Sequence, residues 1–156
     1  MRFPKIAACA VWLLAGPAGA IDLKNAVVVA PAPVTTPEKK ALQTLVEEVA
    51  RRSQVRLRVE NSWPSGSTPV IAVGRAAALR PLAGARMDRL PAPVAGAEGF
   101  RVQATADAVI VAGNDERGVL FGVGWLLRKL RMERGQILEA PDGLRVATAP
   151  KYPLRG

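Results

Sequence analysis

The sequence predicts an α+β fold of the α/β-sandwich type, in which one mixed β-sheet carries helices mainly on one of its faces. Two patterns along the chain carry this prediction. Runs with the length and composition of strands occur at 26–30, 55–59, 70–73, 99–103 and 108–112. Two longer segments, which begin after residues 35 and 115, repeat apolar side chains at helical spacing. Because the chain is short enough for one domain, we expect these strands to form a single sheet.

The segment 99–112 predicts a β-hairpin. Residues 99–103 alternate apolar and polar side chains, residues 104–107 have turn composition, and residues 108–112 form an unbroken apolar run. An unbroken run is typical of a strand that is buried on both faces. We therefore expect the sheet to be covered on both sides at 108–112.

A helix is predicted directly after this hairpin. Asn114 or Asp115 offers a side-chain oxygen for the N-cap, and a buried stripe follows at Val119, Leu120, Val123, Leu126, Leu127 and Leu130. Gly118 and Gly122 share a helix face, which predicts a close approach to the sheet. A phosphate-binding loop is the alternative, but the lysine and hydroxyl of a P-loop and the G-x-G-x-x-G spacing are both lacking.

The first half of the chain predicts a strand, a helix and two more strands. Thr35 or Thr36 is expected to cap a helix with Pro37 near its first position. Its buried stripe is Leu42, Leu45, Val46 and Val49, and its charged residues, which include Glu38, are expected to face solvent. In the run 55–59 the alternation directs Val55, Leu57 and Val59 towards the core.

The remaining segments give weaker patterns. Residues 75–79 predict one helical turn, and residues 81–97, rich in Pro, Ala and Gly, predict an irregular connection. The segments 136–138 and 144–146 are possible edge strands. Trp63, in the loop 61–69, could stack on a sugar ring and is therefore a candidate glycan contact. A lone aromatic side chain in a loop more often covers the edge of a core, and this packing role is favoured.

Residues 1–20 have the pattern of a secretory signal peptide. Arg2 and Lys5 give a positive start, an apolar centre runs to Leu14, and small residues precede a cleavage site after Ala20. We therefore expect a secreted or periplasmic product that has no membrane segment after cleavage. Cys9 lies within this leader, so the mature chain would contain no cysteine.

Composition excludes several function classes. The sequence contains no histidine, which rules out histidine-based triads and histidine zinc sites. We expect no catalytic residues, no metal and no cofactor in this chain. Removing Arg2 and Lys5 with the leader lowers the formal net charge from +9 to +7. Because few aromatic residues lie among the arginines, a generally basic surface is favoured over nucleic-acid recognition.

Several segments together resemble a known domain family: Gly99–Val102, Val109–Gly113, Gly118–Gly122 with Leu126–Leu130, and the closing Pro150–Gly156. They look like the small N-terminal domain that precedes the catalytic TIM barrel in bacterial β-N-acetylhexosaminidases and α-glucuronidases. The resemblance implies a domain at 21–149 that buttresses the barrel without catalytic carboxylates. Residues 150–156 then correspond to the start of the passage into the barrel.

The same resemblance assigns one ligand contact and one partner. Arg155 matches an arginine that reaches hydroxyls of the bound sugar in hexosaminidases. The implied function is that of a non-catalytic accessory domain of a secreted glycoside hydrolase, truncated before its catalytic barrel, with that barrel as its partner. The alternative is a free-standing secreted module that binds a glycan or a protein.

Overall fold

The computed structural model describes residues 21–138 and 143–151. The predicted leader, with its cleavage site and Cys9, and Arg155 lie outside these residues. The elements in chain order are β1 (Val27–Val29), α1 (Thr36–Ser53), β2 (Arg58–Glu60), β3 (Val70–Arg75), α2 (Ala76–Ala83), the 3₁₀ helix η1 (Gly84–Arg89), β4 (Phe100–Ala104), β5 (Ala108–Gly113), α3 (Glu116–Lys129), β6 (Arg131–Glu133), β7 (Gln136–Leu138) and β8 (Arg145–Thr148).

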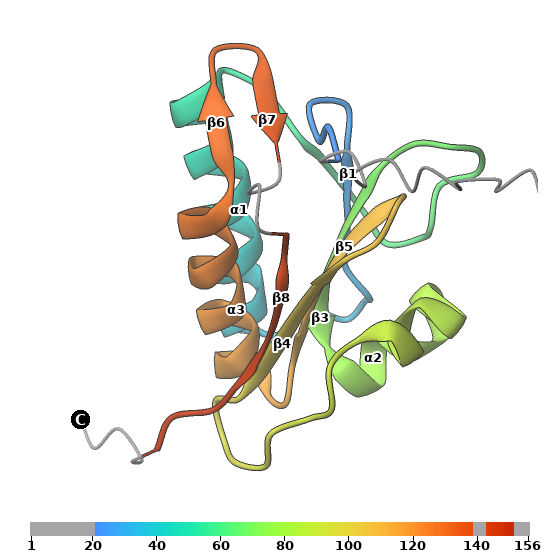
Figure 1. Cartoon of the computed structure of the whole chain (residues 1–156), viewed down its shortest axis with the longest axis vertical. Coiled ribbons are helices and arrows are strands. Elements are labelled where there is room, and N and C mark those ends of the chain that lie inside the picture. Colours follow the sequence, from blue (N-terminus) through green and yellow to red (C-terminus); the bar gives the residue numbers. More distant parts are fainter. Residues whose placement is uncertain (1–20, 139–142, 152–156) are drawn as a thin grey trace, which may run out of the picture.

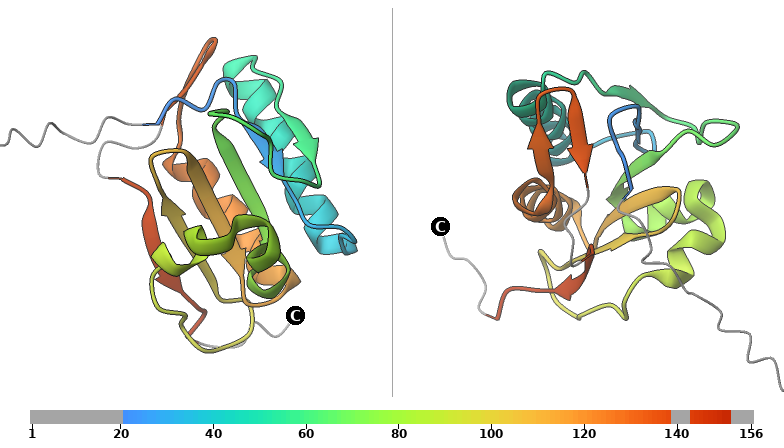
Figure 2. Two further views of the ribbon diagram at one scale, coloured as in Figure 1. Left: turned by 90° about the vertical axis from the view of Figure 1, so that its right-hand side faces the viewer. Right: turned by 45° about the horizontal axis from the view of Figure 1, so that its top comes forward.

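Six of the strands form one mixed sheet in the order β2-β1-β3-β5-β4-β8. The first four are parallel, and β4 runs antiparallel to both β5 and β8. The long helices α1 and α3 lie side by side on one face of this sheet, while α2 and η1 cover part of the other face (Figures 1 and 2). The predicted α/β sandwich, with helices mainly on one face, is therefore confirmed.

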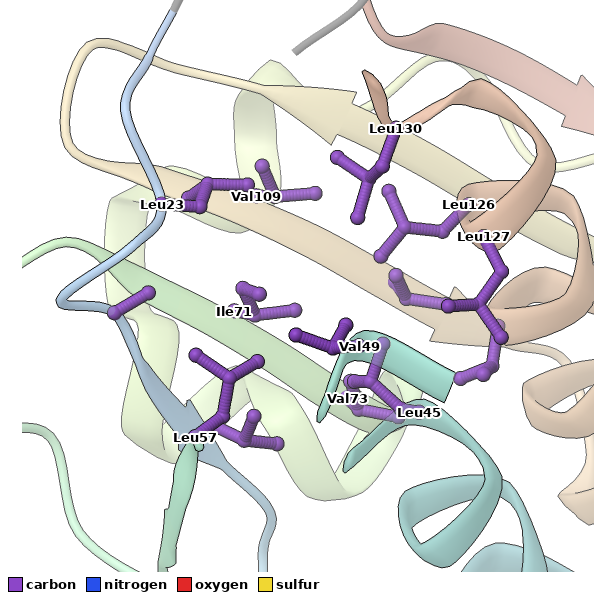
Figure 3. Close-up of a cluster of buried hydrophobic side chains, with 14 of the residues drawn as sticks. Leu23, Leu45, Val49, Leu57, Ile71, Val73, Val109, Leu126, Leu127 and Leu130 are labelled. Atoms are coloured by element: carbon purple, nitrogen blue, oxygen red, sulfur yellow. The ribbon is translucent and has the colours of Figure 1, made fainter. Parts of the chain in front are cut away.

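The two faces bury separate apolar clusters. The larger cluster lies between the sheet and the α1–α3 layer, where Leu45 and Val49 of α1 and Leu126 of α3 meet side chains of β3 and β5 (Figure 3). The smaller cluster lies under α2 and η1. Because both faces are covered, every residue of β5 is buried, as its unbroken apolar run predicts.

The hairpin and both main helices occur where the sequence predicts them, but the expected strand at 55–59 does not. Strand β2 begins at Arg58, and Leu57 is buried whereas Val59 is 49% exposed. Strand β2 is three residues long and lies at the edge of the sheet, so the sheet neighbours it on one side. The alternation places Val59 on the same side as Leu57. It could not show that no helix covers that side of the sheet at the edge strand β2.

The segment 136–138 is a strand in a different place from the one expected. It is β7, which pairs with β6 in a separate two-stranded hairpin and adds no edge to the main sheet. The segment 144–146 corresponds to β8, which does form the outer edge of the main sheet beside β4.

Glu38 was expected to face solvent, and this prediction is wrong. Its side chain is 3% exposed and accepts a hydrogen bond from the backbone N–H of Thr35 at 2.9 Å, while the Thr35 hydroxyl accepts from the N–H of Glu38. The second carboxylate oxygen lies 3.0 Å from Nε of Arg75 at the end of β3. Glu38 therefore caps α1 and ties it to the sheet.

The segment after β3 is more helical than its composition predicts. The single expected turn extends through α2, which contains Pro81, so the stretch 81–97 that was predicted to be irregular begins with the last residues of α2 and continues with η1. Leu79, Ala83 and Met87 are buried at intervals of four residues, so one apolar face continues from α2 into η1. Gly84 has φ of +54° and turns the chain between the two helices.

Candidate functional site

The N-terminus of α3 is clamped onto the loop that leads into β4. Asp115 is the N-cap, and its Oδ1 accepts a hydrogen bond from the N–H of Gly118 at 2.7 Å. Its Oδ2 accepts from the N–H of Glu98, also at 2.7 Å. Asn114, the other candidate cap, instead donates to the carbonyls of Val94 and Gly96. The two neighbouring side chains thus hold the loop 94–98 against the start of the helix.

Two glycines allow α3 to approach the sheet closely, as their spacing predicts. A Cβ atom at Gly118 would lie 2.2 Å from the carbonyl oxygen of Gly99, and one at Gly122 would lie 2.7 Å from Cγ1 of Val111. The start of the helix is therefore filled by the chain itself. This arrangement removes the phosphate-binding alternative, since the space next to Gly118 is occupied by backbone.

An open groove of about 330 Å³ lies beside this clamp, between α3 and the end of β8. We call it the α3–β8 groove. Its lining is mostly apolar and includes Phe100, Leu120, Phe121, Thr148, Ala149 and Pro150. Gly124 also borders it, and a Cβ atom there would meet nothing closer than the Arg128 guanidinium at 3.6 Å. The helix backbone is therefore accessible at the middle of the groove.

A buried carboxylate and an exposed cation mark the polar parts of the groove. Glu98 is 8% exposed, has φ of +63°, and pairs with Arg117 at 3.0 Å. Positive φ is uncommon for a residue other than glycine, and the hydrogen bond that the N–H of Glu98 donates to Asp115 stabilises it here. Arg128 is exposed and pairs with no carboxylate in the part of the chain that the structure describes. An apolar trough with a free cation at its rim is suited to receiving an apolar segment that carries an acid.

These groove residues were not singled out from the sequence as a site. One pattern could have pointed to this side of α3, because Phe121, which lines the groove, and Trp125, which does not, both lie off the predicted stripe of the helix. Both are partly buried and pack against the edge of the larger core cluster. A helix with apolar residues on a second face indicates that another surface covers it.

Trp63 lies on the opposite side of the sheet from the groove. It packs against the smaller core cluster, and the Arg86 guanidinium lies 4.6 Å from the centroid of its ring. This arrangement agrees with the predicted packing role at the core edge. A glycan contact of Trp63 or of Arg155 remains a prediction, and the structure does not bring Trp63 to the groove.

The carboxylates of the described residues do not gather into a catalytic or metal-binding set. Within 21–138 and 143–151 there is no cluster of three His, Cys, Asp or Glu side chains that could hold a metal ion. Glu38, Glu98 and Asp107 each pair with an arginine on a neighbouring element. The Arg86 side chain bonds to Asp107 and, despite some burial, keeps the pKa of Asp107 below its ordinary value. In the same ranges, no helix is long and apolar enough to cross a bilayer.

Comparisons with known proteins give the same fold in glycoside hydrolases. No family model matches the chain, and no curated protein matches it by sequence. Among solved structures, the chain is similar to CpGH84B (TM-score 0.63, 14% identity, 87% of this chain and 21% of that chain). It is also similar to the GH20 β-N-acetylhexosaminidase from Streptomyces coelicolor A3(2) (TM-score 0.58, 15% identity, 86% of this chain and 24% of that chain). A third similar structure is the GH115 4-O-methyl-α-glucuronidase BtGH115A (TM-score 0.59, 16% identity, 85% of this chain and 18% of that chain).

At these low identities, the TM-scores show a shared fold and no more. The chain spans less than a quarter of the length of the glycoside hydrolases that it matches, whereas the match covers most of the chain itself. The predicted likeness to glycoside hydrolases is thus confirmed at the level of fold. The N-terminal position of the domain and its association with a barrel stay predictions.

Proposed function

We propose that this chain is a non-catalytic accessory domain of a secreted glycoside hydrolase that acts in carbohydrate degradation. The observation that carries the proposal is the asymmetric coverage of the structural matches, which span at least 85% of this chain but at most 24% of those hydrolases. A domain that is a small part of several glycoside hydrolases is well placed to support a catalytic domain.

We further assign the α3–β8 groove as the surface on which the catalytic barrel packs. Support comes from the chain path, because Ala149 and Pro150 both line the groove. Any domain joined after residue 156 begins six residues beyond Pro150, and six residues span at most about 22 Å. A tethered partner would therefore have a high effective concentration at the groove.

The first test is the intact mass of the native secreted product together with its hydrolytic activity. The proposal expects a product several-fold heavier than this chain, and it expects the chain alone to leave aryl N-acetylglucosaminides and aryl glucuronides intact. Turnover by the chain alone would refute the non-catalytic role. A native product that ends at residue 156 would favour the free-standing binding module instead.

A second test addresses the groove itself. In the isolated domain, a dye that fluoresces on apolar surfaces should bind at the groove, and Phe121→Asp should reduce that binding strongly because it places a charge on the groove wall. Val59→Asp is the matched control, since Val59 is 49% exposed and lies on β2 at the far edge of the sheet. Equal losses in the two variants would show that the groove is not the main apolar surface.

A further inference from the structure

The face of the sheet opposite the groove carries an unbalanced group of arginines. Five of them surround η1, and we call them the arginine face: Arg80, Arg86, Arg89, Arg101 and Arg145. Two carboxylates neutralise part of this charge, because Asp88 pairs with Arg80 and Asp107 pairs with Arg86. The other three arginines pair with no carboxylate within the described residues. A local excess of positive charge therefore remains.

Arg101 and Arg145 occupy neighbouring positions on adjacent strands. In the β4–β8 register, Arg145 lies opposite Gln103, two residues from Arg101, so the two arginines are diagonal neighbours on one face. Diagonal positions are about 7–8 Å apart at Cα, within reach of long side chains. One anionic group could thus contact both guanidinium groups.

Both side chains are fixed in place by the backbone that follows η1. Arg101 donates to the carbonyl of Pro91 at 3.2 Å, and Arg145 donates to the carbonyl of Arg89 at 3.4 Å and to Oε1 of Gln103. A guanidinium has five N–H donors, so each arginine keeps donors beyond these bonds. The preorganised donors would lose little conformational entropy on binding an anion.

One N–H donor of the Arg101 side chain has no hydrogen-bond acceptor among the described residues. This donor is Nε, which is buried. Burial, and secondarily the positive charge of Arg80, hold the pKa of Arg101 below its ordinary value. A buried donor without a partner, in a site short of negative charge, is the usual position of a bound water or anion.

A hollow lies next to these side chains. It has a volume of about 360 Å³ and is lined by Arg86, Arg89 and Asp107, together with the small residues Ala85 and Ala106. Since the Arg145 guanidinium bonds to the carbonyl of Arg89, the hollow and the two strand arginines are contiguous. The surface can therefore contact several anionic groups in a row, as a polymer with repeated charges would present them.

We propose that the arginine face binds the carboxylates of an acidic oligosaccharide. The planar forks of arginine match a carboxylate in a two-bond geometry, and the spread of the arginines matches repeated charges. Nucleic acid is the competing polyanion, but it is usually held by aromatic stacking as well. The one aromatic ring at this face that the structure places, Trp63, already has Arg86 against it. The proposal is independent of the accessory role, because it concerns the other face of the sheet.

The test is an NMR titration of the mature chain with trigalacturonate at about 0.1 M salt, where the Debye length is about 10 Å. Saturable shifts are expected at the amides of 86–91, 101–103 and 145–147. Arg145→Gln should weaken binding about tenfold, the usual effect of losing a charge-assisted hydrogen bond. Arg145 is exposed, so this variant should fold normally, and Arg101→Gln provides a second one.

The control is Arg134→Gln, which removes the same charge from the exposed turn between β6 and β7, outside both surfaces. Its affinity should stay within about twofold of the parent, because exposed charges farther away than a Debye length are largely screened. Equal weakening by the Arg145 and Arg134 variants would mean general charge attraction and would overturn the proposal. So would the absence of saturable shifts, or tighter binding of oligothymidylate at the same amides, which would assign the face to nucleic acid.

Discussion

The two faces of the sheet are covered to different extents. We call the face under α1 and α3 the deep face and the face under α2 and η1 the shallow face. On one face, α1 and α3 span 18 and 14 residues and bury the larger cluster. On the other, α2 and η1 span 8 and 6 residues and bury a smaller one. On the deep face, α3 borders the α3–β8 groove, and the shallow face carries the arginine face.

This comparison suggests two kinds of interaction. Burial of apolar surface at the groove would favour a permanent neighbour, and its strength would change little with salt. Binding at the arginine face would weaken as salt is added, because its charges are partly exposed. One small domain could therefore be fixed to a partner on one face and hold a charged ligand on the other.

The largest expected effect separates the two cores directly. Leu126 on the deep face and Leu79 on the shallow face are both fully buried. Leu126→Ala should lower the free energy of unfolding by about 3–5 kcal/mol, and Leu79→Ala by about 2–3 kcal/mol, because the short α2 can relax more easily around a cavity. Urea unfolding of both variants measures the difference. Equal losses would mean that the two cores are equally rigid.

A second prediction concerns the close contact between α3 and the sheet. Gly118→Ala should lower the free energy of unfolding by about 2–3 kcal/mol, since its Cβ would meet the backbone oxygen of Gly99. Gly124→Ala, in the same helix, faces the groove and meets no atom within 3.4 Å. It should be neutral or stabilising by up to about 1 kcal/mol. If both substitutions were harmless in urea unfolding, the helix would not need its glycines for packing.

Local patterns were sufficient for the deep face. The stripe of α3, its glycine pair and the hairpin 99–112 are set by spacing along one segment, and the structure has each of them. The capping box of α1 is also local, and Thr35 was one of two residues named for it. The helix features could be predicted because each depends on neighbours within about four residues, and the hairpin because its two strands are joined by a short turn.

The shallow face and the site depended on contacts that are distant in sequence. Glu38 was placed in solvent because its burial requires Arg75, which lies 37 residues later. Val59 was placed in the core because alternation does not reveal which part of a sheet face a helix covers. The helix predicted at 75–79 was too short. Pro81 and Gly84 favoured an irregular segment, although Leu79, Ala83 and Met87 have helical spacing. The α3–β8 groove joins segments whose meeting no local pattern shows.

The smallest expected effect concerns the bond that joins the two faces, between Glu38 of α1 and Arg75 at the junction of β3 and α2. Burial disfavours the charge of Glu38, but the hydrogen bond from Thr35 and the ion pair with Arg75 outweigh it, so the pKa of Glu38 is lowered. Its stabilising contribution is therefore fully present above the ordinary glutamate pKa of about 4.3 and is lost as the pH falls through the lower value of the folded state.

Glu38→Gln keeps a side chain that can cap the helix but removes the charge. At pH 7 it should lower the free energy of unfolding by about 1–2 kcal/mol, and the difference from the parent should shrink steadily as the pH is lowered from 5 towards 3. Glu47→Gln, on the exposed side of the same helix, should change it by less than about 0.5 kcal/mol. A Glu38 effect that did not depend on pH would show that the charge of Glu38, and with it the ion pair with Arg75, does not stabilise the fold.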